Sequence, residues 1–220
     1  MARRLKIVWD AGEVTAILDG SGANGVLLAH GAGTDQEHPN MVALRGRLAE
    51  QGFTVMTFNY PYTERGSKRP DRPEKLVECH QAAAEALHQD VDRLFLAGRS
   101  MGGRMGTYLA AEGYDCSGLI LYSYPLHPAG KPEKLRVAHF PEVTRPMLFF
   151  QGTRDPLSRM ELFDRYIRPL PNATVEVLDG ANHGFSGGGW TPQSMIERLA
   201  TGSAAFITAV SSGESGRTTA

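Results

Sequence analysis

The sequence predicts one α/β domain, built on a mostly parallel eight-stranded sheet with helices on both faces. Three observations lead to this fold class. The length of 220 residues suits a single domain of this kind. Eight short apolar runs alternate with helical patterns along the chain. Several runs, such as VLLA and MLFF, are apolar without alternation, which is typical of strands that are covered on both faces.

The predicted strands follow these apolar runs in order. They cover residues 5–9, 14–18, 26–30, 54–60, 93–97, 119–122, 147–151 and 174–178. A parallel pair needs a long crossover connection, and the first two runs lie too close together for one. We therefore expect these two strands to form an antiparallel hairpin at the edge of the sheet.

Helical patterns fill most of the gaps between the later strands. Met41, Leu44 and Leu48 lie on one helical face. Longer helical patterns cover residues 74–88 and 101–112. The sequence therefore predicts the alternation of strands and helices that produces a parallel sheet.

Two further signals mark where later helices begin. Ser158 and Glu161 match a capping box, in which two side chains satisfy the first free amides of a helix. Thr191 followed by Pro192 predicts the start of the last helix, because proline has no amide hydrogen to leave unpaired there.

The last helix precedes the polar segment SSGESGRTTA at residues 211–220. Its composition predicts a flexible tail. The predicted domain therefore covers residues 1–210.

Composition and charge exclude several classes of protein. Apolar residues make up 41% of the chain, charged residues 21%, and the formal net charge is −1. We therefore expect neither nucleic acid nor a membrane as a partner, and no apolar run has the length of a membrane span or a signal peptide. Cys79 and Cys116 lack the spacing of a metal site or a redox pair. We expect two reduced thiols in a cytoplasmic protein that requires no metal or cofactor.

The strongest functional signal is the segment Gly98-Arg99-Ser100-Met101-Gly102, which matches the pattern G-x-S-x-G. A strand is predicted before it and a helix after it, as in a nucleophile elbow. Glycines relieve the crowding in such a strained turn, and the N-terminus of the helix favours negative charge. A plain glycine-rich turn is the alternative, but this context favours Ser100 as a nucleophile.

A serine nucleophile needs a base to accept its proton, and His183 has the best position among the seven histidines. It lies in the segment DGANHGF, just after the predicted strand 174–178. A histidine at this place completes the chain order nucleophile, acid, base. Surface positions are expected for five other histidines, namely His38, His80, His88, His127 and His139.

Two aspartates compete for the role of the acid that orients this base. Asp155 follows the buried strand 147–151 in the segment QGTRDP, where its carboxylate can reach a histidine. Asp179 is closer to His183 in sequence, but a turn with the glycine after it explains this residue adequately. We therefore predict a catalytic triad of Ser100, Asp155 and His183.

Two backbone amides are predicted to form the oxyanion hole, the pair of donors that stabilises a tetrahedral intermediate. One belongs to Met101, directly after the nucleophile. The other is expected from the segment HGAG at the end of the third strand, where Ala32 is the predicted donor. The small residues of this segment allow its backbone to turn beneath a substrate carbonyl.

These motifs together resemble the α/β-hydrolase superfamily across most of residues 26–210. The segments AHGAGTDQEHPNM, FNYPY, GRSMGGR, YPLHP, QGTRDP and ANHGF are more specific. They resemble its small, cap-less, dienelactone-hydrolase-like branch, which also holds a testis-expressed hydrolase-like protein and a subunit of a histone acetyltransferase complex. A dienelactone hydrolase uses a cysteine nucleophile, so Ser100 does not imply that substrate.

The motifs and the resemblance imply a serine hydrolase that cleaves a small-molecule carboxylic ester or thioester through an acyl-enzyme on Ser100. The alternative is a catalytically idle hydrolase fold that serves as a protein-interaction module. Such proteins normally lose a triad residue, whereas this chain retains all three candidates.

The segment after Tyr60 is rich in basic residues, and Arg99 and Arg104 lie beside the elbow. The basic residues of the segment are Arg65, Lys68, Arg69 and Arg72. A solvated charged loop is the interpretation that we favour. Recognition of an acidic group on the substrate is the alternative.

Overall fold

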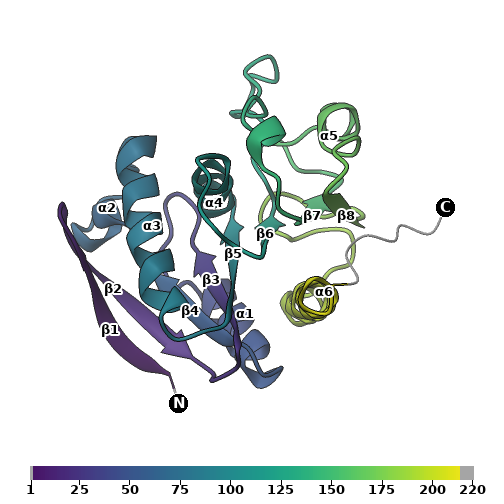
Figure 1. Cartoon of the computed structure of the whole chain (residues 1–220). Helices are drawn as coiled ribbons and strands as arrows, with labels where there is room; N and C mark the ends of the chain where they lie inside the picture. Colours follow the sequence, from purple (N-terminus) through teal and green to yellow (C-terminus); the bar gives the residue numbers. More distant parts are fainter. Residues whose placement is uncertain (1, 214–220) are drawn as a thin grey trace.

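The computed structural model describes residues 2–213, which fold into an eight-stranded sheet between two layers of helices (Figure 1). The strands are β1 Arg3–Trp9, β2 Gly12–Asp19, β3 Asn24–Ala29, β4 Thr54–Phe58, β5 Arg93–Arg99, β6 Gly118–Tyr122, β7 Met147–Gly152 and β8 Ala173–Leu178. The helices are α1 Pro39–Glu50, α2 Pro61–Glu64, α3 Pro73–His88, α4 Met101–Ala111, α5 Met160–Tyr166 and α6 Pro192–Ser211, with a 3₁₀ turn at Phe140–Glu142. All eight predicted strands are present.

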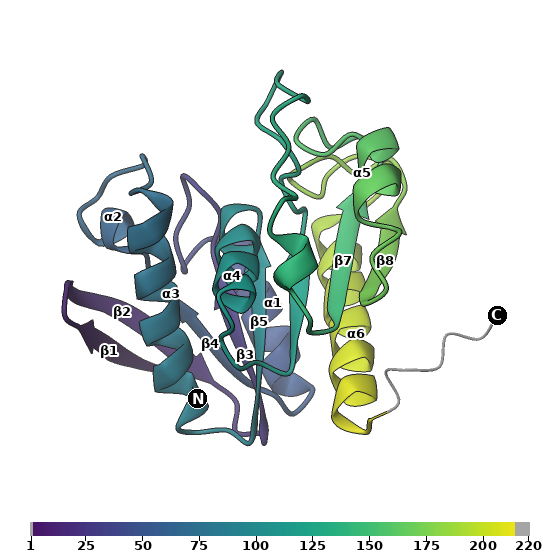
Figure 2. The same ribbon diagram turned by 45° about the horizontal axis from the view of Figure 1, so that its top comes forward.

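The sheet is mixed, with strand order β1-β2-β4-β3-β5-β6-β7-β8. β1 and β2 form the predicted antiparallel hairpin at one edge, and β2 also pairs antiparallel with β4. All later neighbours in this order are parallel. The carboxyl ends of β3, β5 and β7 therefore share one edge of the sheet, at the top of Figure 2, and this is the edge where parallel sheets bind ligands.

Two apolar layers fill the space on either side of the sheet. α1 and α6 cover one face, while α3, α4 and α5 cover the other (Figure 1). Neighbouring strand residues alternate between the two layers: Leu27 packs with the α3 and α4 side, and Leu28 with the α1 and α6 side. Because both layers are apolar, the central strands show no polar alternation.

No cap domain covers the carboxyl edge within the described residues, as the sequence predicts. The connection between β6 and β7, residues 123–146, contains only the 3₁₀ turn as regular structure. Over the same range of residues, 2–213, no helix combines the length and the hydropathy that a membrane crossing demands.

The predicted capping box at Ser158 and Glu161 is wrong. α5 has Arg159 at its N-cap position and no side-chain cap. Ser158 lies one residue before this N-cap position, and its amide closes a turn on the Asp155 carbonyl at 3.2 Å. Its hydroxyl is buried without a hydrogen-bond partner among the described residues.

The last helix begins as predicted. The side chain of Thr191 accepts a hydrogen bond from the Ser194 amide, which caps α6. At its other end, α6 continues through Ser211, so the first residue of the predicted tail 211–220 is helical. Residues 214–220 of that tail lie outside the described residues, and the domain boundary at 210 stays a prediction.

Candidate active site

β5 delivers Ser100 to the carboxyl edge through a turn that is strained for a serine. Its φ of 51° and ψ of −112° lie in a region that residues with a side chain rarely adopt. The Ser100 amide donates to the Tyr122 carbonyl at 2.9 Å, and the Ser100 carbonyl accepts from the Arg104 amide at 3.1 Å. β6 and α4 therefore hold this residue from both sides.

The glycines on either side of Ser100 are required by close backbone contacts. A Cβ on Gly98 would lie 2.4 Å from the carbonyl carbon of Gly102. A Cβ on Gly102 would lie 2.5 Å from the carbonyl oxygen of Ala29. Because these neighbours are backbone atoms, they cannot rotate away. β3, β5 and α4 thus pack more closely at the elbow than any larger residue would allow.

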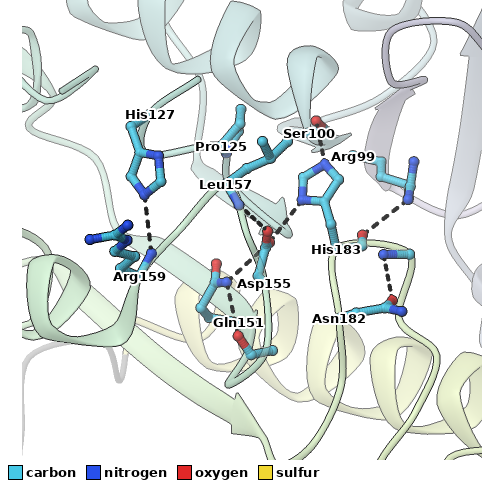
Figure 3. A network of polar contacts seen from close by, with 12 residues as sticks. Arg99, Ser100, Pro125, His127, Gln151, Asp155, Leu157, Arg159, Asn182 and His183 are labelled. Atoms are coloured by element: carbon cyan, nitrogen blue, oxygen red, sulfur yellow. Dashed lines mark hydrogen bonds and ion pairs between the residues drawn. The ribbon is translucent and has the colours of Figure 1, made fainter. Parts of the chain in front are cut away.

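Ser100, His183 and Asp155 form one chain of hydrogen bonds (Figure 3). His183 Nε2 lies 2.9 Å from Ser100 Oγ, and His183 Nδ1 lies 2.8 Å from Asp155 Oδ2. An ionised carboxylate can only accept, so in a neutral imidazole Nδ1 donates to Asp155 and Nε2 accepts from the serine hydroxyl. This is the tautomer in which a histidine can take a proton from a serine.

Asp155 is buried, and both of its carboxylate oxygens are used. Oδ1 accepts from the Leu157 amide at 2.8 Å. Oδ2 accepts from Gln151 Nε2 at 3.2 Å in addition to the histidine (Figure 3). Because these two donors, at the end of β7 and in the loop that follows it, fix the carboxylate, it holds the His183 ring in one orientation.

Asp179, the rival acid, lies elsewhere. Its Oδ1 accepts from Thr153 Oγ1 at 3.1 Å, and its backbone carbonyl accepts from Trp190 Nε1 at 3.0 Å. These contacts close a turn between the ends of β7 and β8. The structure therefore brings Asp155, and not Asp179, to the His183 ring.

The loop that carries His183 is fixed by two residues that sequence analysis did not assign. Asn182 Oδ1 accepts from the amides of Gly184 and Ser186, at 2.8 and 3.1 Å. Arg99 Nη2 donates to the His183 carbonyl at 3.0 Å (Figure 3). Asparagine is a known turn former, so its place directly before the histidine is a local signal for this turn. The contact made by Arg99 joins residues far apart in sequence, and no local signal predicts it.

The two predicted oxyanion donors lie on segments that meet at Ser100. Met101 is the first residue of α4, and the first amides of a helix have no partner inside the helix. On the other segment, a Cβ on Gly31 would lie 3.4 Å from the Arg99 carbonyl oxygen and 3.6 Å from Ser100 Cβ. Within the described part of the chain, the amides of Ala32 and Met101 donate to no other group.

A buried histidine orients the segment that holds Ala32. His30 Nε2 accepts from the Tyr60 amide at 3.2 Å, so Nδ1 carries the proton and donates to the Gly31 carbonyl at 2.8 Å. Burial lowers the pKa of His30 to about 4, so the ring is neutral at neutral pH. The tautomer is thereby fixed, and the backbone of the HGAG segment is held at one place.

The predicted surface positions are wrong for two other histidines. His80 is fully buried, Tyr60 Oη lies 2.9 Å from its Nδ1, and burial lowers its pKa to about 3. It lies one turn from Leu76 on the buried face of α3. His127 is also buried, and its Nε2 accepts from the Arg159 amide at 3.3 Å (Figure 3). This contact supports the loop that follows Asp155.

The two cysteines are unpaired and buried. Burial raises the pKa of both thiols, that of Cys116 to about 12, so both are protonated and poorly nucleophilic at neutral pH. Across residues 2–213, no three His, Cys, Asp or Glu side chains gather in a way that could hold a metal ion.

The basic segment after α2 is a loop whose four basic residues are all exposed. Arg65 forms an ion pair with Asp71 at 2.7 Å, inside the same loop. Arg104, beside the elbow, lies with its guanidinium carbon 5.8 Å from the centre of the Tyr108 ring. The loop therefore offers exposed surface charge, whereas Arg99 and Arg104 are partly buried.

The fold and this arrangement define a class of protein, the α/β hydrolases, in which a serine elbow follows a central parallel strand. A sequence profile of the alpha/beta hydrolase domain matches residues 22–208. The chain belongs to this family of hydrolases.

Solved structures share the fold at low sequence identity. Est1E from Butyrivibrio proteoclasticus aligns with a TM-score of 0.75 and 17% identity, over 93% of this chain and 99% of that chain. XC6422 from Xanthomonas campestris, a serine hydrolase without a lid, aligns with a TM-score of 0.69 and 17% identity, over 99% and 97%. Dienelactone hydrolase from Anabaena variabilis aligns with a TM-score of 0.76 and 17% identity, over 94% and 97%. The fold is that of the small, cap-less, dienelactone-hydrolase-like branch.

Proposed function

We propose that the protein is a serine hydrolase that cleaves a carboxylic ester or thioester through an acyl-enzyme on Ser100. The observation that carries this proposal is the hydrogen-bonded chain from Ser100 Oγ through His183 to the buried carboxylate of Asp155. A serine becomes a nucleophile only with a base in reach, and the base works only when it is oriented.

In the first half of the reaction, Ser100 Oγ attacks the carbonyl carbon of the substrate while His183 Nε2 takes the hydroxyl proton. Asp155 stabilises the imidazolium that forms. The amides of Ala32 and Met101 donate to the developing oxyanion. The imidazolium then gives its proton to the leaving alcohol or thiol, and the acyl group stays on the serine.

In the second half, water attacks the acyl-enzyme. His183 Nε2 takes a proton from this water and returns it to Ser100 Oγ as the tetrahedral intermediate collapses. The carboxylic acid product then leaves. These steps use only the side chains and amides of the chain, so the proposed reaction requires neither metal nor cofactor.

The partner that we propose is a small-molecule ester or thioester rather than nucleic acid or membrane. The carboxyl edge suits a small substrate, because residues 2–213 place no cap domain over it. A cytoplasmic location is also part of the proposal, since two free, buried thiols fit a reducing compartment.

The test is hydrolysis of a panel of esters and thioesters by purified protein, followed by acid quenching and mass spectrometry. We expect turnover, and an acyl group on the peptide that contains Ser100. Ser100→Ala should lose both. Ser158→Ala, which removes a buried hydroxyl that has no hydrogen-bond partner among the described residues, should keep both. Folded wild-type protein that hydrolyses no member of the panel would favour the interaction module instead.

A further inference from the structure

An apolar pocket of about 150 Å³ lies beside the candidate active site, between α1, α6 and the loop after His183. Its apolar wall includes Leu28, Met41, Leu44, Phe185, Met195 and Leu199. We propose that this pocket binds the acyl group of the substrate and restricts it to a short apolar chain or a single aromatic ring. The inference rests on the proposed function, because it names the substrate class of the same site.

The position of the pocket follows from the segments that form it. Arg99, in the elbow directly before Ser100, lines the pocket. Gly184, directly after His183, lines it as well. The third segment is the start of α1, which follows the HGAG loop and contributes Met41. Each of the segments that hold the nucleophile, the base and the oxyanion donor thus continues into the pocket wall.

Phe185 supplies a second, independent observation. Its φ is 61°, a conformation that is rare for an aromatic residue. The turn around Asn182 imposes it, because the Phe185 amide donates to the Asn182 carbonyl at 2.9 Å and the next amide is bound by the Asn182 side chain. The ring is buried in the α1 and α6 layer. Backbone strain of this kind is typical of ligand clamps and active sites.

The volume of the pocket limits what it can hold. An apolar cavity of about 150 Å³ in another protein stays dry and binds one benzene molecule. The pocket therefore suits about six to eight carbon atoms. Each methylene group that it buries should raise kcat/KM about four-fold, the equivalent of ~0.8 kcal/mol.

The experiment measures kcat/KM for p-nitrophenyl esters of straight-chain acids from acetate to dodecanoate, and for the benzoate. We expect kcat/KM to rise about four-fold per methylene, to peak near six to eight carbons, and then to fall. Ile196→Trp, at a partly exposed position in the pocket wall, should lower the ratio of the hexanoate value to the acetate value at least about ten-fold.

Two leucines of α1 give a matched pair of variants. Leu44 lines the pocket, whereas Leu48, one turn further along the helix, is buried outside its wall. Leu44→Ala should move the optimum toward longer chains by about two to three carbons, since the pocket becomes deeper. Leu48→Ala creates a similar cavity elsewhere and should leave the chain-length optimum unchanged.

A flat chain-length profile, or the same shift in Leu44→Ala and Leu48→Ala, overturns the acyl pocket while acetate turnover still supports the proposed function. Absence of turnover on every ester overturns the proposed function and the acyl assignment with it. If Leu44→Ala does not fold, Ile196→Trp decides, because a partly exposed position tolerates a larger side chain.

Discussion

Two regions at the carboxyl edge of the sheet, the candidate active site and the basic loop at residues 65–72, differ in how their charges are held. Asp155 is buried and accepts from three donors, of which His183 lies on a separate loop. In the loop, the ion pair of Arg65 and Asp71 lies within one segment, and the other basic side chains are exposed. The first arrangement fixes the position of each group, whereas the second only places charge near the site.

This difference predicts how the two regions respond to substitution. Removing one partner from a buried charge network costs about 3 to 5 kcal/mol. An exposed ion pair contributes about 0 to 1 kcal/mol and is screened by salt. Substitutions in the candidate active site should therefore have large effects, and those in the basic loop small ones.

The largest expected effect compares the two aspartates. Asp155→Asn should lower kcat about ten-thousand-fold, because the amide does not hold the tautomer in which His183 Nε2 accepts a proton. Asp179→Asn should change kcat less than about three-fold, since that side chain contacts Thr153 and not the histidine. Ester hydrolysis by both folded variants tests this prediction, and equal losses would contradict the assignment of the acid.

Glycines provide the next comparison, measured as the free energy of unfolding. Gly102→Ala should cost about 3 kcal/mol or more, because its Cβ would meet the backbone of β3. Gly66 in the basic loop has open space around it, and its positive φ of +70° is the one source of strain for a larger residue. Gly66→Ala should therefore cost about 1 to 2 kcal/mol. Urea unfolding of both variants gives the difference, and a Gly102→Ala protein as stable as wild type would show that the elbow is loosely packed.

Acid should destabilise the fold through two buried histidines, His30 and His80, rather than through the basic loop. The pKa values of His30 and His80 are lowered by burial to about 4 and about 3. As pH falls below about 6.5, the unfolded chain binds protons that the folded chain does not, so the free energy of unfolding decreases. The stability is complete above about pH 6.5 and is lost as pH falls toward the lowered values.

The slope is at most about 1.4 kcal/mol per pH unit for each of these histidines. Urea unfolding at about pH 7 and about pH 5 measures the slope. His80→Gln should reduce this slope, because glutamine does not titrate. An unchanged slope in that variant would mean that His80 is protonated in the folded protein.

The smallest effect is expected from the basic loop itself. Replacing Arg65, Lys68, Arg69 and Arg72 together by glutamine should leave kcat/KM for neutral esters within about two-fold. For an anionic ester we expect a loss below about five-fold that disappears with added salt. A larger loss, specific for anionic esters, would favour recognition of an acidic substrate over a solvated loop.

The sequence predicts the strands and the hydrogen-bonded residues well because their signals are local. The signal for Ser100 is a glycine two positions before it and another two positions after it. Both glycines are required, because nearby backbone atoms leave no room for a Cβ at either position. His183 and Asp155 each follow a strand that is recognisable from its apolar run. Since parallel strands end at one edge, three local signals at strand ends are sufficient to bring the residues together.

Other features depend on contacts between distant segments and have no local signal. The order of β4 and β3 in the sheet follows from tertiary packing, not from the apolar runs themselves. The pocket beside Phe185 needs α1 and α6 to lie side by side, although they are far apart in the chain. The polar side chain of His80 in a helical pattern predicts a surface position, whereas one hydrogen bond to Tyr60 is enough to allow its burial.

The most direct test of the central claim is labelling with a fluorophosphonate probe, which reacts with activated serines. Ser123 offers a matched control, since it is also buried, has a φ of 50°, and has no hydrogen-bond partner for its hydroxyl among the described residues. We expect the probe on Ser100 alone, no labelling of Ser100→Ala, and full labelling of Ser123→Ala. Labelling that survives in folded Ser100→Ala, or that is absent from folded wild-type protein, would contradict the account.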